Sequence, residues 1–392
     1  MPALQGLLSI ALVLLIINTC AAVIKKQSAS PLNSEFFKWS FVFGSIYALG
    51  AVGSSNTSIT QFDIIQKSTV AVLGFMLICG NMYHPLTLIK AQKYFILSNI
   101  ATFILCVILA SLRYVESNNV QDFFYTGLSV FLHPGYFSMY LSLCLAFLFK
   151  NLNKEDKLFR SNQISWILIS IIFTAIYLLS SKSGIISGLL ISLVFSIITL
   201  RRKVLSKKIM RLGFLLSLLI LVAILIPTKT NRLNSIINDL ETFQYKKDYE
   251  LNTSGQRIFI WQAAIRVIKE NFWLGTGVGN ENKALLKQLE LEDHQYLLLL
   301  KPNAHNQFLQ VFMTLGIGGF LFFTSYIFLP LYLSLKRKDI LLLSFSIIII
   351  VNALTESIFN RQAGILFWTV WGFLLIESNG QKVNLTKVNR TT

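Results

Sequence analysis

The chain has few charged residues and few cysteines. Only 14% of its 392 residues are charged, whereas 54% are hydrophobic, and the mean hydropathy is +0.61. A soluble domain cannot bury that much apolar surface, so the composition excludes a soluble globular protein and indicates an integral membrane protein. The cysteines all fall in apolar stretches and share no ligand spacing, so they predict neither a disulfide framework nor a metal site; they are Cys20, Cys79, Cys106 and Cys144.

Apolar runs of roughly 17 to 25 residues recur along the chain, a length that crosses the hydrocarbon core as a helix. Backbone groups in lipid must be hydrogen-bonded internally, and no ten-residue alternation typical of barrel strands is present, so these runs predict helices. The expected fold is an all-α, polytopic membrane protein with about eleven transmembrane helices (roughly 10–12) and one large helical extracytoplasmic loop. The predicted spans are 3–24, 36–53, 65–82, 94–112, 132–149, 163–180, 184–200, 212–227, 306–335, 339–355 and 362–377.

The net charge of +17 would suit a nucleic-acid partner, but the position of the charges argues against one. Basic residues concentrate in alternate connections, such as the run between Arg201 and Arg211. The intervening short connections carry one basic residue or none. This alternation is the positive-inside pattern of a membrane protein, and it predicts a cytoplasmic C-terminus and an external location for residues 228–304.

The predicted organisation is one membrane domain with one insertion. Residues 1–227 form an N-terminal transmembrane bundle of about eight helices, and residues 305–377 complete it. Residues 228–304 form the external, periplasmic loop, and residues 378–392 a cytoplasmic tail. Within the loop, apolar periodicity predicts helices over 232–243, 256–270 and 281–289. Residues 274–280, Leu-Gly-Thr-Gly-Val-Gly-Asn, predict a tight turn; without a P-loop lysine or a preceding strand they do not indicate a phosphate nest.

Arg257 stands close to the start of the helix predicted over 256–270. An arginine there opposes the helix dipole, and a residue placed against local preference suggests an anionic partner. The planar guanidinium donates two hydrogen bonds at once to phosphate oxygens. The alternatives are a solvated helix charge or an ion pair with Asp248 or Glu250.

His305 and Asn306 stand at the entry of an apolar helix, after a break at Pro302. Histidine exchanges a proton near neutral pH, which suits a general base. The alternative is a histidine that satisfies a nearby carbonyl at a helix start. Asn306 is a candidate for orienting a sugar or for capping the helix. Deeper in the same helix, the glycines predict close helix packing; they are Gly316, Gly318 and Gly319.

Further candidates share the predicted external face. Lys182 is either a second cation of the same site or a snorkelling lysine. Arg361 and Glu356 either belong to the site or pair with each other. His133 begins another helix and is a candidate for lining a pocket. Mid-membrane positions hold almost no ionisable residues, which ion-coupled transporters usually need, and this argues against transport.

Several short motifs occur together in the second half of the chain. They are Ser254-Gly255-Gln256-Arg257 followed by Trp261 and by Leu274-Gly275-Thr276-Gly277; His305-Asn306 followed, after nine residues, by Gly316 and Gly319; and Glu356 followed by Gln362-Ala363-Gly364. Together they resemble the O-antigen ligase and O-antigen polymerase family of bacterial membrane glycosyltransferases, over roughly residues 180–377. One departure is Ser181-Lys182-Ser183-Gly184, where the family commonly has Ser-Arg-Gly. Lysine there loses the bidentate geometry of arginine.

The resemblance implies a metal-independent, inverting glycosyl transfer at the periplasmic face of the bacterial inner membrane, without a cofactor. The donor would be a glycan on undecaprenyl diphosphate, and the acceptor a sugar hydroxyl on lipid A-core or a similar glycan. Arg257 would stabilise the leaving diphosphate, with Lys182 and Arg361 as supporting cations. His305 would orient or deprotonate the acceptor hydroxyl, beside Asn306, His133 and Glu356.

Two other functions stay open. The single large loop and the histidine motif favour a ligase, as in lipopolysaccharide biosynthesis. The lysine at position 182 leaves room for an O-antigen, capsule or exopolysaccharide polymerase that uses the same type of donor. A membrane transporter or flippase is the alternative from another class, because a fold by itself does not define an activity.

Overall fold

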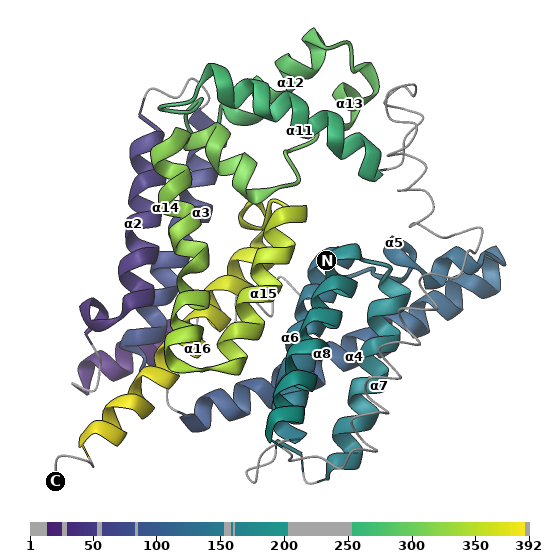
Figure 1. Ribbon diagram of the computed structural model, residues 1–392. Coiled ribbons are helices and arrows are strands. Elements are labelled where there is room, and N and C mark those ends of the chain that lie inside the picture. The colour runs from purple at the N-terminus through teal and green to yellow at the C-terminus, as the bar shows by residue number, and fades with distance from the viewer. Residues whose placement is uncertain are drawn as a thin grey trace.

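The computed structural model describes residues 14–25, 30–52, 57–82, 85–152, 158–159, 161–202 and 253–388. Every regular element within these residues is a helix, which confirms the all-α fold class (Figure 1). Backbone N–H and C=O groups in lipid have no water to bond with. A long apolar helix pairs these groups within its own segment, so it suits a chain this apolar.

Among the described residues, five helices are long and apolar enough to cross a membrane, which agrees with a multi-pass membrane protein. They are α3 (Thr57–Cys79), α4 (Pro85–Ser117), α6 (Pro134–Leu152), α7 (Asn162–Leu179) and α14 (Gln307–Arg337). Shorter apolar stretches occur at Leu14–Ile24 and in α8 (Lys182–Arg202), α15 (Ile340–Thr355) and α16 (Gln362–Val388). Helix α2 (Glu35–Gly50) packs along α3. The predicted span 212–227 lies outside the described residues, so the total number of crossings stays a prediction.

Helix α3 differs from its prediction in a way that matters chemically. It begins at Thr57, ahead of the predicted start at 65, and therefore contains both Asp63 and Lys67. Lys67 is buried, and its ammonium lies 2.9 Å from a carboxylate oxygen of Asp63. An ionisable pair thus lies within a helix of membrane-spanning character, contrary to the expectation that such positions hold almost none. A charge is tolerated there when its partner is buried with it.

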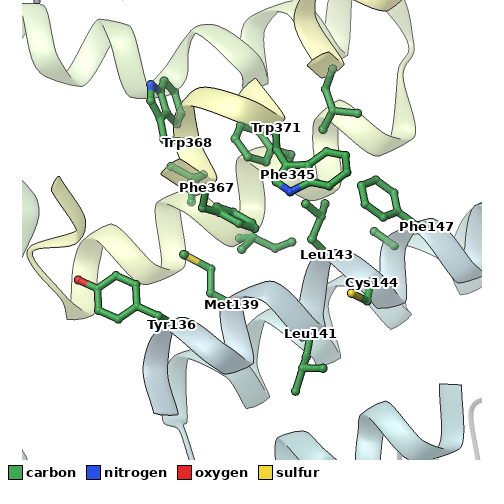
Figure 2. Close-up of a cluster of buried hydrophobic side chains, with 14 of the residues drawn as sticks. Tyr136, Met139, Leu141, Leu143, Cys144, Phe147, Phe345, Phe367, Trp368 and Trp371 are labelled. Atoms are coloured by element: carbon green, nitrogen blue, oxygen red, sulfur yellow. The ribbon is translucent and has the colours of Figure 1, made fainter. Parts of the chain in front are cut away.

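An aromatic core joins α6, α15 and α16 (Figure 2). The rings of Phe147 and Trp371 lie 4.8 Å apart, and those of Phe345 and Trp368 lie 5.7 Å apart. The indole N–H of Trp368 donates to the hydroxyl of Tyr326, so the polar tip of this buried tryptophan is satisfied. Packed aromatic side chains of this size hold the three helices in fixed relative positions.

The segment after residue 252 folds into helices α11 (Thr253–Glu270), α12 (Glu281–Leu291) and α13 (Gln295–Leu300). They lie across one end of the bundle, at the top of Figure 1, which is called the loop end below. Their apolar faces form a separate small core of Ile260, Ala264, Leu285, Leu289 and Leu297. The helices predicted over 256–270 and 281–289 are confirmed. The helix predicted over 232–243 lies outside the described residues.

Helix α14 is broken at Gly316, which adopts a left-handed φ of 65°. The turn after α11 fills the break: the N–H of Thr276 donates to the carbonyl of Met313 (2.7 Å), and the N–H of Ile317 donates to that of Phe272 (2.9 Å). A side chain on Gly316 would collide with the carbonyl oxygen of Trp273. The predicted tight turn is confirmed, and the glycine permits close packing against this turn.

Candidate active site

His305 lies in a short irregular segment between α13 and α14. Its φ of 43° is left-handed, and its N–H donates to the side-chain oxygen of Asn303 (2.9 Å). Asn306 is the N-cap of α14, because its side-chain oxygen accepts from the N–H groups of Phe308 and Leu309. The indole N–H of Trp261 on α11 donates to the carbonyl of Ala304 (2.9 Å). These bonds hold the imidazole at the loop end of the bundle.

Glu356 follows the last residue of α15. Its N–H donates to the carbonyl of Asn352 (2.8 Å), which closes the final turn of the helix. The chain then crosses to α16 through residues 356–361, and the N–H of Phe359 donates to the side-chain oxygen of Gln307 (2.7 Å). The connection between α15 and α16 is thereby attached to the start of α14, the same segment that carries His305.

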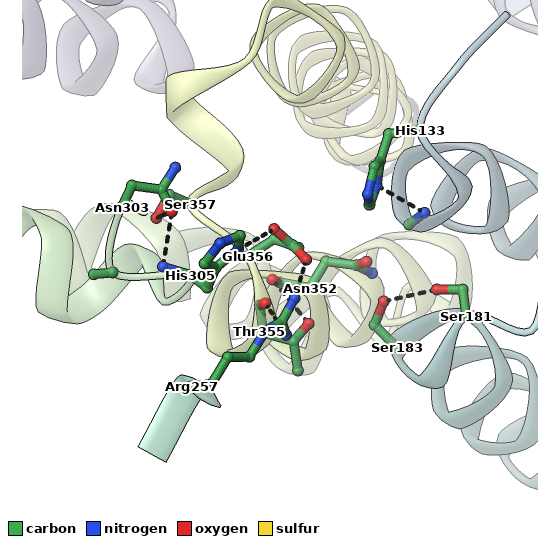
Figure 3. Close-up of polar contacts among 12 residues, drawn as sticks. His133, Ser181, Ser183, Arg257, Asn303, His305, Asn352, Thr355, Glu356 and Ser357 are labelled. Atoms are coloured by element: carbon green, nitrogen blue, oxygen red, sulfur yellow. Dashed lines mark hydrogen bonds and ion pairs between the residues drawn. The ribbon is translucent and has the colours of Figure 1, made fainter. Parts of the chain in front are cut away.

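One carboxylate joins the two main catalytic candidates (Figure 3). One oxygen of Glu356 lies 2.5 Å from Nη2 of Arg257, and the other lies 3.1 Å from Nδ1 of His305. Nη1 of Arg257 also donates to the carbonyl of Thr355 (2.7 Å). The side chains of Arg257, Glu356 and His305 are 26%, 17% and 33% exposed, so the cluster is partly screened from solvent yet reachable.

This pairing decides between the alternatives for these residues. Glu356 pairs with Arg257 and His305, and not with Arg361 as one alternative held. The other partners considered for Arg257, Asp248 and Glu250, lie outside the described residues. Arg257 and Glu356 are 99 positions apart, and only the approach of α11 to the end of α15 brings them together.

The charge of Glu356 follows from its surroundings. Burial raises the pKa of a carboxyl group, but the hydrogen bond with His305 and the positive charge of Arg257 outweigh burial and lower the pKa of Glu356. An ionised carboxylate only accepts hydrogen bonds. Nδ1 of His305 is therefore the protonated nitrogen of this pair, and Nε2 of the neutral ring is the atom left to accept a proton.

A small polar cavity of about 80 Å³ opens beside the cluster. Four elements contribute predicted residues to its lining: His133 before α6, Lys182 at the start of α8, Arg257 on α11 and Glu356 after α15. Burial lowers the pKa of His133, whose Nδ1 accepts from the N–H of Gly135 (3.3 Å). Ser181 and Ser183 also line it and belong to the motif around Lys182. The other lining residues were not singled out from the sequence, because isolated hydroxyl and small residues carry no spacing signal; they are Tyr125, Gly135, Ser180 and Thr355.

Three predicted site residues do not line this cavity: His305, Asn306 and Arg361. Arg361 is exposed and does not line it, although its positive charge also acts to lower the pKa of His133. Asn306 is engaged in capping α14. Their proposed contacts with substrate stay predictions.

Comparison with known proteins agrees with the motifs. Residues 167–324 match the family model described as O-Antigen ligase. The matched region contains Lys182, Arg257 and His305 and ends before Glu356. The chain matches none of the curated protein sequences with which it was compared. The match over 167–324 and the motifs inside it support the resemblance of this region to the O-antigen ligase and polymerase family.

Proposed function

We propose that the protein transfers a glycan from undecaprenyl diphosphate to a sugar hydroxyl of lipid A-core or a similar acceptor, at the periplasmic face of the inner membrane. The observation that carries this proposal is the carboxylate of Glu356, which contacts both the guanidinium of Arg257 and the imidazole of His305 and itself lines a polar cavity. A cation for a leaving group and a base for a nucleophile are the two groups that such a transfer needs.

Arg257 stabilises the leaving group in this mechanism. The bond between the anomeric carbon and the diphosphate oxygen breaks, and negative charge accumulates on the departing lipid diphosphate. The bonds of Arg257 to Glu356 and Thr355 use two of the five N–H donors of a guanidinium. The other donors suit phosphate oxygens, and Lys182 adds a second positive charge to the lining of the cavity.

His305 acts on the acceptor. The acceptor hydroxyl oxygen attacks the anomeric carbon from the face opposite the diphosphate, which inverts the configuration, and the hydroxyl proton passes to Nε2. The ionised carboxylate of Glu356 at Nδ1 fixes the tautomer and stabilises the imidazolium that forms. Proton transfer of this kind contributes about 10²–10⁴ to a rate.

A crevice between α3 and α16 is suited to hold the prenyl chain. It has a volume of about 260 Å³ and is lined mainly by apolar residues, among them Phe62, Ile65 and Ile365. Phe62 and Ile65 are 65% and 68% exposed, so the crevice is open at the surface of α3. A lipid chain needs such access. Gln362 lines the crevice next to Arg361 in sequence, which supports Arg361 as a cation near the diphosphate.

Deletion of the gene in its host tests the proposal. Surface glycans are run on a gel beside extracted lipid-linked intermediates. We expect a bare acceptor, with full-length polymer accumulating on the lipid carrier. Capped single repeats without a ladder would assign the protein as a polymerase instead. An unchanged pattern of both fractions would contradict glycosyl transfer and favour transport.

A further inference from the structure

Lys67 is a buried cation that the proposed chemistry does not use. Its side chain is 2% exposed and lies in α3, outside the lining of the polar cavity. Its ammonium donates to Asp63 (2.9 Å), to the side-chain oxygen of Gln66 (3.2 Å) and to that of Asn360 (3.2 Å). An ammonium has three donors, so these acceptors satisfy it completely.

The three acceptors do not have the same consequence for the fold. Asp63 and Gln66 belong to α3, the helix that carries Lys67. Asn360 belongs to the connection between α15 and α16. The bond to Asn360 is therefore a contact between α3 and this connection, while the other two bonds balance the charge and hydrogen-bonding needs of the lysine within its own helix.

The connection begins at Glu356, the carboxylate that holds Arg257 and His305. Two polar contacts attach it to the segment around His305: the hydroxyl of Ser357 with Asn303 (3.4 Å), and the N–H of Phe359 with Gln307 (2.7 Å). The bond from Lys67 to Asn360 attaches its far end to a different helix. Fixing both ends of a short connection restricts the positions of the residues between them.

We propose that Lys67, acting through Asn360, is a positioning residue that keeps Glu356 in register with Arg257 and His305. Asp63 pairs with the buried lysine and holds its side chain in place. This inference rests on the proposed glycosyl transfer, because the benefit of a fixed Glu356 is expressed in that reaction.

Substitutions at Asn360 test the inference while the Lys67–Asp63 pair stays intact. Asn360→Leu removes the acceptor at similar volume, and Asn360→Asp keeps an acceptor. Each purified protein is reconstituted in liposomes. Initial rates are measured with lipid-linked glycan purified from the host's deletion strain and with the host's own acceptor. Asn360→Ala serves as a second acceptor-free variant if leucine lowers the yield of folded protein.

We expect Asn360→Leu to lower kcat about tenfold, the effect of losing one hydrogen bond to a charged group. The KM for the donor should stay within about twofold of the parent value, and the melting temperature within about 2 °C, because a positioning defect need not change binding or global stability. Asn360→Asp should keep kcat close to the parent value.

The other outcomes are distinguishable. Parental kcat in the acceptor-free variants, or a loss in Asn360→Asp as large as in Asn360→Leu, overturns the positioning role. Arg257→Ala, measured in parallel, should transfer glycan about 10²–10³-fold more slowly than the parent. Parental transfer by that variant would overturn the assigned site, and a parent protein that transfers no glycan would overturn the proposed function, whatever the Asn360 variants do.

Discussion

A residue with a positive φ stands just before α14, and another lies inside the helix. The positive φ has a different consequence at each position. His305, just before the helix, has a φ of 43°, and its ring reaches the carboxylate of Glu356. Gly316, inside the helix, has a φ of 65°, and the turn after α11 occupies the space that a side chain would need. At His305 the geometry accompanies a side chain that reaches a carboxylate, and at Gly316 it admits a neighbouring backbone.

The difference separates a functional break from a structural one. A residue with a Cβ in the left-handed region costs about 1–2 kcal/mol, whereas glycine adopts it freely. A histidine retained at such a position indicates that its ring contributes something that glycine does not. At position 316 the residue with a positive φ is a glycine, which adopts it without strain. Hydrogen-bonded backbone of the neighbouring turn fills the space around it.

The largest expected effect comes from His305→Gly. Transfer should fall about 10²–10⁴-fold, because the base is lost. The free energy of unfolding should change by less than about 1 kcal/mol, since relief of the left-handed strain offsets the lost hydrogen bond to Glu356. Rates in liposomes and thermal unfolding in detergent measure the two quantities. If the folded variant transfers glycan at the parental rate, His305 is not the base, and its position has no functional role that Gly316 lacks.

Arg257→Ala should lower transfer about 10²–10³-fold, as expected when a preorganised donor to a developing negative charge is removed. Arg266→Ala is the matched control, because Arg266 lies on the same helix, is 56% exposed and pairs with Glu292 away from the cavity. The control should transfer glycan at the parental rate. Similar losses in both variants would mean that α11 tolerates no arginine substitution, and would not support a specific role for Arg257.

At the second break, Gly316→Ala should lower the free energy of unfolding by about 2 kcal/mol or more, because it adds left-handed strain and a collision with the turn. Gly318→Ala is the control two positions away: its added methyl group meets nothing within 4 Å. That variant should be neutral or more stable by up to about 1 kcal/mol. Thermal unfolding in detergent compares the pair, and equal stabilities would contradict the packing described at Gly316.

The smallest effect concerns pH. The pKa of Glu356 is lower in the folded protein than its usual value, so its charged form stabilises the fold above the usual carboxyl pKa. That contribution is lost as the pH falls through the lowered pKa. When the pH is lowered from 7 to below about 4, the melting temperature of the parent should drop about 2 °C more than that of Glu356→Gln. Equal drops would show that Glu356 gains nothing from its two partners.

Much of the fold was predictable because helices in lipid leave a direct mark on the sequence. Apolar runs predicted α6, α7, α14 and α15 within a few residues. The start of α3 was missed, because Asp63 and Lys67 interrupt the apolar run and their burial depends on partners from elsewhere, including Asn360. An apolar-run criterion counts such residues against a helix, whereas the folded protein satisfies them in pairs.

The candidate site was predictable in its members and less so in its geometry. Arg257 carried a local signal, a cation at a helix start, and His305 carried another, a titratable residue before an apolar helix. Nothing local indicated that Glu356 bridges them, and one alternative paired it with Arg361. The capping role of Asn306 was among its expected roles, and the structure shows the bonds that perform it.

The sequence by itself determined that this protein is helical and suited to a membrane, and it identified the residues with chemistry to offer, because hydrophobic length and helix-end preferences act over a few turns of chain. Only the tertiary structure decided which of those residues meet. Three contacts join distant parts of the chain: the ion pair of Arg257 with Glu356, the packing of the 271–279 turn against Gly316, and the hydrogen bond from Lys67 to Asn360. Contacts of that kind depend on how whole helices pack, and packing is settled by all the side chains of both partners together.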